Sequence, residues 1–188
     1  MGLSGKILYL HGYGSNGSSD TAAVIRELFP DYQVISPTYT YLDPMNAAEQ
    51  LGRLCEDNVF DLIIGSSLGG FWSMYLGQEH CIPALAINPS VNASENLKKY
   101  NIDGLSSLYE EFETYLVMCL TDHDREPCTV ILGSNDDVIP NQPVEFLREK
   151  VKVVNTDWEH RMPKSPEATV LIRGLGDELM GNIIGCQG

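Results

Sequence analysis

Short apolar runs, rich in β-branched residues, alternate along this chain with segments in which apolar residues recur every three or four positions. The first pattern is typical of buried strands and the second of amphipathic helices. The sequence predicts strands at residues 6–10, 33–35, 61–64, 84–87, 129–132 and 152–154, and helices at residues 21–29, 44–57, 68–78, 143–150 and 166–184. Regular alternation, with strands that are apolar on both faces, predicts a single α/β domain over residues 1–188. Its sheet would be doubly wound and mostly parallel, with about six strands and helices on both faces.

One segment interrupts the alternation. Between Asn88 and Pro127 no strand pattern occurs, and we expect a helical insertion near residues 91–127. Apolar residues at helical spacing mark one face of a helix within it. Two interpretations stay open, a lid whose apolar face lines a substrate pocket and an ordinary helix packed on the sheet. The candidate pocket residues, called here the apolar stripe, are Leu105, Leu108, Tyr109, Phe112 and Leu116.

The most informative motif follows the third predicted strand, where residues 65–69 read Gly-Ser-Ser-Leu-Gly. A G-x-S-x-G sequence between a strand and a helix is typical of a nucleophile elbow, with Ser67 as the nucleophile. The two glycines leave room for neighbouring backbone, and the first N–H groups of the helix point toward the reacting centre. Ser66 is out of frame with the glycines and is interpreted as a packing residue.

A serine hydroxyl needs a base, and the base needs an orienting acid. In doubly wound hydrolases these follow the serine in the order acid, then histidine, on loops after later strands. The loop after residues 129–132 carries Asp136 and Asp137, and the loop after residues 152–154 carries His160. We predict His160 as the base and one of the two aspartates as the acid. The chain's other histidines are interpreted as structural, capping or solvated residues; they are His11, His80 and His123.

A glycine-rich turn follows the first predicted strand, where residues 11–14 read His-Gly-Tyr-Gly. Backbone N–H groups in such a turn can stabilise a tetrahedral oxyanion, together with the N–H of the residue after the nucleophile. We predict the amides of Tyr13 and Leu68 as these donors, and we interpret His11 as a residue that holds the loop.

Composition narrows the possible partners. The net charge of −14 disfavours nucleic acid and anionic membrane surfaces, and no stretch approaches the length of a membrane span. Five scattered cysteines, without a C-x-x-C pair, argue against a disulfide framework or zinc site. We therefore expect a cytoplasmic protein without metal or organic cofactor, acting on a small molecule. The sequence leaves the oligomeric state open.

These motifs resemble the small α/β-hydrolases of the YqiA-type esterase family over almost the whole chain. The likeness is carried by residues 9–13, 65–70, 87–90, 133–136 and 159–161. It implies Asp136 as the acid, because in the wider superfamily the acid lies three residues after a strand-end glycine. It also implies hydrolysis of acyl esters or thioesters by a Ser67–Asp136–His160 triad. Other interpretations that the sequence leaves open are a small serine peptidase, another acyl-transfer enzyme, and a hydrolase-fold binding protein with little turnover.

Overall fold

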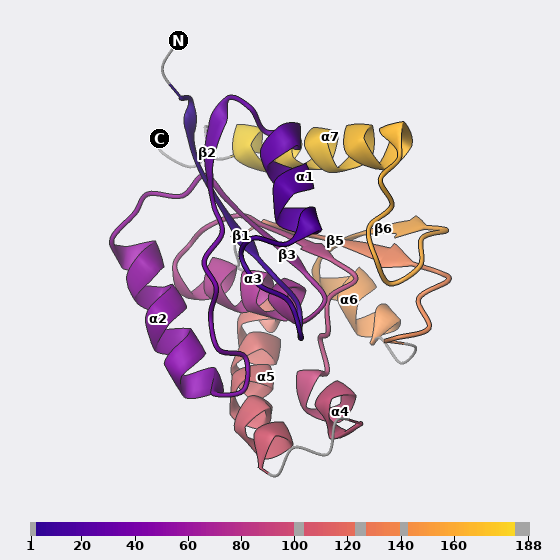
Figure 1. Ribbon diagram of the computed structural model, residues 1–188. Helices are drawn as coiled ribbons and strands as arrows, with labels where there is room; N and C mark the ends of the chain where they lie inside the picture. The colour runs from indigo at the N-terminus through magenta and orange to yellow at the C-terminus, as the bar shows by residue number, and fades with distance from the viewer. Residues whose placement is uncertain (1–2, 100–103, 123–126, 140–142, 183–188) are drawn as a thin grey trace.

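Six parallel strands form one sheet at the centre of the computed structural model, which describes residues 3–99, 104–122, 127–139 and 143–182 (Figure 1). The strand order is β2-β1-β3-β4-β5-β6. The strands are β1 (Gly5–Leu10), β2 (Tyr32–Ile35), β3 (Leu62–Ser66), β4 (Ala84–Ile87), β5 (Cys128–Gly133) and β6 (Lys152–Thr156). Each overlaps a predicted strand, and every pair of neighbours is parallel. The predicted parallel sheet is therefore confirmed.

The helices connect these strands and follow the last one. They are α1 (Asp20–Leu28), α2 (Pro44–Glu56), α3 (Leu68–Glu79), α4 (Ala93–Lys98), α5 (Leu105–Thr121), α6 (Val144–Lys150) and α7 (Pro166–Asn182). Local chemistry fixes some of their starts. The side chain of Asp43 accepts a hydrogen bond from the Asn46 N–H, and Pro44 occupies the first turn of α2, where an N–H would lack a helical partner. The last two residues of the predicted helix 166–184 lie outside the described residues.

Both faces of the sheet are covered, because alternate residues of each strand point to opposite sides. Ile7 and Tyr9 of β1 pack with α1 and α7, whereas Leu8 and Leu10 of the same strand pack with α2 and α3. Figure 1 shows α1 and α7 on one side of the sheet and α2, α3 and α6 on the other. This is the doubly wound arrangement that the sequence predicts. Within the described part of the chain, no helix is long and apolar enough to cross a membrane.

The topology creates a crevice between β1 and β3. From β1 the chain moves to the edge strand β2 and then returns to place β3 on the other side of β1. The segments that leave β1 and β3 therefore run to opposite faces of the sheet, α1 to one and α3 to the other. Ligands of open parallel sheets bind at such a switch point, at the carboxyl ends of the strands.

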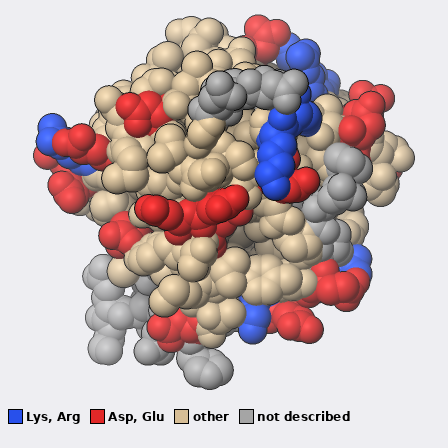
Figure 2. Space-filling view, turned by 90° about the horizontal axis from the view of Figure 1, so that it is seen from below, with Lys and Arg blue, Asp and Glu red and all other residues tan. Residues whose placement is uncertain are grey.

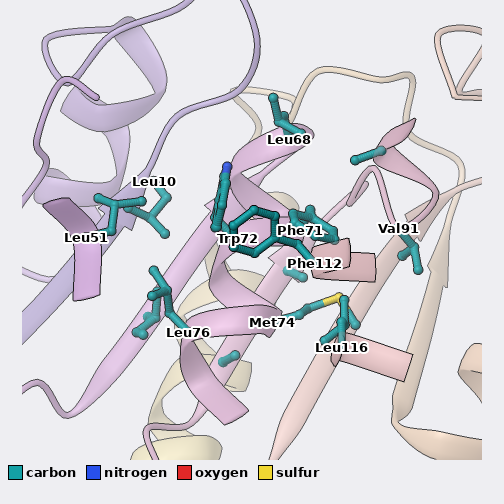
Figure 3. Packing of buried hydrophobic residues seen from close by; sticks show 14 of the residues in the cluster. Leu10, Leu51, Leu68, Phe71, Trp72, Met74, Leu76, Val91, Phe112 and Leu116 are labelled. Atoms are coloured by element: carbon teal, nitrogen blue, oxygen red, sulfur yellow. The ribbon is translucent and has the colours of Figure 1, made fainter. Parts of the chain in front are cut away.

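The insertion contains two helices, α4 and α5, and no strand among its described residues. Four of the five stripe residues are buried in the core cluster that also holds Phe71 and Trp72 of α3; they are Leu105, Tyr109, Phe112 and Leu116. Aromatic side chains of α3 and α5 contact one another, and the rings of Trp72 and Phe112 are centred 5.2 Å apart (Figure 3). Leu108 instead faces solvent and is 46% exposed.

This placement corrects one of the two interpretations of the stripe. The four buried residues do not form the wall of an open pocket, because α3 covers them with its own aromatic side chains, and Leu108 faces solvent. The second interpretation, a helix packed in the core, describes α5. Figure 2, a view from below toward α4 and α5, shows several separate groups of acidic side chains over this face, with Lys and Arg side chains among them.

We expect Phe112→Ala to lower the free energy of unfolding by about 3–5 kcal/mol, because it empties a buried site against Trp72. Leu108→Ala, on the exposed side of the same helix, should cost less than about 1 kcal/mol. Urea unfolding of both variants checks the difference. Equal losses would contradict the packing role of α5.

Candidate active site

Ser67 stands in a strained turn between β3 and α3. Its backbone has φ of 57° and ψ of −122°, a conformation that non-glycine residues rarely adopt. Glycines on both sides make the turn possible. A Cβ on Gly65 would overlap the carbonyl oxygen of Gly69, and one on Gly69 would overlap that of Leu10. The backbone of the elbow therefore packs directly on the end of β1, and the strain at Ser67 directs its hydroxyl away from the sheet.

His160 lies between Ser67 and Asp136. Its Nε2 is 3.0 Å from the Ser67 Oγ, and its Nδ1 is 2.8 Å from an Asp136 carboxylate oxygen. An ionised carboxylate only accepts hydrogen bonds, so Nδ1 carries the hydrogen and Nε2 is left to accept the serine proton. The structure thus brings together the three side chains from the ends of three different strands.

The side chain of Asp136 is fixed in position for its hydrogen bond with His160. The side chain is 6% exposed, and its second oxygen accepts hydrogen bonds of 2.9 Å from the backbone N–H groups of Val138 and Ile139. These two bonds fix the orientation of the carboxylate. Asp137 is exposed and borders the same cavity as Ser67 and His160. The geometry therefore places Asp136, and not its neighbour, beside the histidine.

The glycine-rich turn after β1 passes against the serine. A Cβ on Gly12 would lie 2.9 Å from the Cβ of Ser67. Tyr13 follows in this turn, and Leu68 is the first residue of α3, where N–H groups have no partner within the helix. Both residues border a cavity that also includes Ser67. Their amides remain the predicted oxyanion donors.

His11 supports this turn from beneath. It is 1% exposed and stacks on Tyr39, with ring centroids 4.4 Å apart. Its Nδ1 lies 2.9 Å from the Gly12 carbonyl oxygen, and the Tyr39 N–H points at Nε2. Burial lowers the pKa of His11. A neutral ring that donates to Gly12 and accepts from Tyr39 fits the interpretation of His11 as a residue that holds the loop.

Two cavities open beside Ser67. The larger one, of about 670 Å³, is bordered by the β1–α1 segment and by the loop that carries His160. The smaller one, of about 20 Å³, is bordered by α4, Leu68 and the segment after Asp136. No residue of the apolar stripe is among the described residues that line either cavity. Within the same residues, no group of three or more His, Cys, Asp or Glu side chains could hold a metal ion.

Residues 6–172 match the model of the uncharacterised protein family UPF0227. The chain belongs to this family. The UPF0227 protein YcfP of Escherichia coli is 29% identical over 145 residues, which cover 72% of this chain and 78% of YcfP.

Solved structures show the fold of this UPF0227 protein. The esterase domain of a Rhodothermus marinus protein superimposes with a TM-score of 0.71 at 13% identity, covering 96% of this chain and 88% of the other. The s-formylglutathione hydrolase FrmB of Staphylococcus aureus gives 0.68 at 14% identity, covering 96% and 85%. The UPF0227 protein therefore has the α/β-hydrolase fold that the resemblance implied.

None of the sequence motifs assigns a role to Asn88, the residue that follows β4. It is 1% exposed and has φ of 43°, in the left-handed region where asparagine is tolerated. Its Nδ2 donates to the carbonyl oxygens of Glu159 and His160, at 2.8 and 3.0 Å, and its Oδ1 accepts from the Gly133 N–H at 2.7 Å. One buried amide thus ties the histidine loop to the end of β5, three residues before Asp136.

A signal for Asn88 was present in the sequence. A polar residue directly after a continuous apolar strand, followed by proline, stands at the carboxyl edge where parallel sheets place their sites. The pattern does not reveal the partners, because Glu159 and His160 are more than 70 residues away. The small cavity was also missed, since α4 and residues 138–139, which complete its lining beside Ser67, are marked by no motif.

We expect Asn88→Gly to slow the labelling of Ser67 by a fluorophosphonate about tenfold, because the loop that carries His160 loses two hydrogen bonds and the end of β5 loses one. Glycine accepts the left-handed backbone, so this variant removes the amide without straining the chain. The labelling rate at saturating and subsaturating probe separates loss of reactivity from loss of probe binding.

Asn155→Gly, the same change at an exposed position of β6, is the control and should leave labelling unchanged. If Asn88→Gly and wild type were labelled at equal rates, Asn88 would not position the histidine.

Proposed function

We propose that this protein is a serine hydrolase that cleaves carboxylic esters or thioesters through an acyl-enzyme. The observation that carries the proposal is the hydrogen-bonded series from the Ser67 hydroxyl to His160 and from His160 to Asp136. Distances of 3.0 and 2.8 Å lie within the reach required for proton transfer and for orientation of the base. The series lies at the topological switch point and opens into a cavity.

The first half of the reaction forms the acyl-enzyme. The Ser67 oxygen attacks the carbonyl carbon while His160 Nε2 takes the hydroxyl proton. Asp136 accepts the Nδ1–H bond, holds the ring in this tautomer and balances the charge of the imidazolium. The amides of Tyr13 and Leu68 stabilise the oxyanion. His160 then gives its proton to the departing oxygen or sulfur, and the bond from the carbonyl carbon to the leaving group breaks.

The second half releases the acyl group. Water takes the place of the leaving group, and His160 removes a proton from it as its oxygen attacks the acyl carbon. The second tetrahedral intermediate is stabilised by the same two amides. Its collapse breaks the bond to Ser67, whose oxygen recovers the proton from His160. The balance is one ester or thioester and one water consumed, and one acid and one alcohol or thiol produced.

The similarity to solved hydrolase structures supports this proposal at the level of fold. The chain shares its architecture with an esterase domain and with an s-formylglutathione hydrolase, both below 25% identity. Because one fold can host unrelated activities, the proposal depends on the site and not on this likeness.

Ser67→Ala should lower kcat for p-nitrophenyl acetate by about 10⁴–10⁶, because the nucleophile is lost while the rest of the site remains. Ser107→Ala, on the exposed side of α5, is the matched control and should keep wild-type turnover. Circular dichroism of both variants checks that the fold is intact. A Ser67→Ala protein that retained a tenth of the activity would exclude Ser67 as the nucleophile.

Asp136→Asn and Asp137→Asn form a second matched pair. We expect Asp136→Asn to lower kcat by about 10³–10⁴, since an amide cannot balance the imidazolium and favours the wrong tautomer. Asp137→Asn should change kcat less than about threefold, because His160 Nδ1 bonds to Asp136 and not to its exposed neighbour. Steady-state hydrolysis of p-nitrophenyl acetate measures both effects. The reverse order would move the acid to Asp137.

A further inference from the structure

The two cavities meet at Ser67 and have different neighbours. Ser67, Tyr13 and Val138 border both, so Tyr13 and Val138 form the partition between them. His160 borders only the larger cavity, and Leu68 borders only the smaller one. The larger cavity is therefore next to the proposed base, His160. The smaller cavity is next to Leu68, whose amide is a predicted oxyanion donor.

The chemistry assigns a part of the substrate to each side. The leaving oxygen or sulfur takes its proton from His160 Nε2, so the leaving group departs into the cavity that His160 borders. The acyl group is attached to the opposite side of the same carbon. It therefore extends into the smaller cavity, next to Leu68.

The smaller cavity limits the acyl group. A volume of about 20 Å³ is only slightly more than one water molecule needs, and it suits a methyl group. Part of its wall is packed in place, whereas Lys99 and Val138 are exposed. Leu68, Leu97 and Ile139 are each less than 5% exposed, and the Asn96 side chain donates a 2.9 Å hydrogen bond to the Ser90 hydroxyl.

The larger cavity favours a polar leaving group. Hydroxyl groups line the side formed by the β1–α1 segment, among them Ser15, Ser19 and Thr21. Charged side chains stand on the loop opposite, where Lys164 lies 3.3 Å from an Asp20 carboxylate oxygen across the cavity. A pocket for a long alkyl chain is lined mostly by apolar side chains, and this one is not.

We infer that the substrate is an ester or thioester of a short acid, acetyl in size, with a larger polar alcohol or thiol. This inference rests on the proposed function and narrows it. Neither cavity suits a fatty acyl chain, because the small one lacks the room and the large one lacks the apolar walls.

The test compares p-nitrophenyl esters of acetate, butyrate and octanoate, which share a leaving group and differ only in the acid. We expect kcat/KM for acetate to exceed that for butyrate at least about tenfold, and octanoate to be slower still. A second pair, monoacetylglycerol and hexyl acetate, varies only the alcohol. The glycerol ester should be hydrolysed at least about tenfold more efficiently.

Val138→Ala tests the assignment of the small cavity. The side chain is 37% exposed, so its loss creates no buried void, and its backbone N–H still binds Asp136. Shortening the partition should raise the ratio of butyrate to acetate kcat/KM about fivefold. Val170→Ala, the same change at an exposed position of α7, should leave the ratio unchanged.

Three results would overturn the inference while leaving the proposed function in place. They are equal kcat/KM for acetate and octanoate, equal kcat/KM for the two acetate esters, and an unchanged ratio in Val138→Ala. Each would occur in a protein whose Ser67 is still labelled by a fluorophosphonate. Absence of both turnover and labelling would instead overturn the proposed function and the inference together.

Discussion

The close approach of β1 to the elbow is the constraint on which the candidate site depends. Backbone from the end of β1 occupies the space that a side chain on Gly69 would fill, and the Gly69 carbonyl occupies the space beside Gly65. Contacts of this kind cannot adjust by a change of rotamer, so they hold the backbone of Ser67 at φ of 57°. Parallel pairing of β1 with β3 in a single register makes the approach possible, since Leu10 faces Gly65 across the ladder.

A second restraint acts from the other side of the site. β4 lies between β3, which leads to Ser67, and β5, which leads to Asp136. Asn88 follows β4, and its side-chain oxygen accepts a hydrogen bond from the Gly133 N–H. Its side-chain nitrogen donates to the carbonyl oxygens of Glu159 and His160. In addition, the Ser90 N–H donates to the Ser67 carbonyl oxygen at 2.9 Å. The short segment after β4 thus connects all three loops that carry the candidate triad.

Much of this architecture could be predicted from the sequence, because local patterns encode it. Apolar runs located the six strands, and the glycines around Ser67 located the elbow. Chain order pointed to Asp136 and His160, which the structure brings within hydrogen-bond distance of each other. The resemblance was needed to separate Asp136 from Asp137, since both follow the same strand.

What could not be predicted depends on contacts between distant residues. The apolar stripe of α5 has the same spacing whether it faces a pocket or a helix, and only the position of Trp72 and its neighbours decides between them. The role of Asn88 is hidden for the same reason, as its partners lie far along the chain. The size of the small cavity depends on how α4 and residues 138–139 meet, which no periodicity describes.

The hydrogen bond between Ser67 and His160 joins residues 93 positions apart, and this separation has a consequence for folding. A chain that has paired only β1, β2, β3 and β4 already contains the elbow, but neither the acid nor the base stands beside it. A lone serine hydroxyl is a weak nucleophile, so a partly folded chain lacks the base that the proposed reaction requires. Contacts of such long range form slowly compared with local ones. The candidate triad is therefore complete only when the β5–β6 edge of the sheet has assembled.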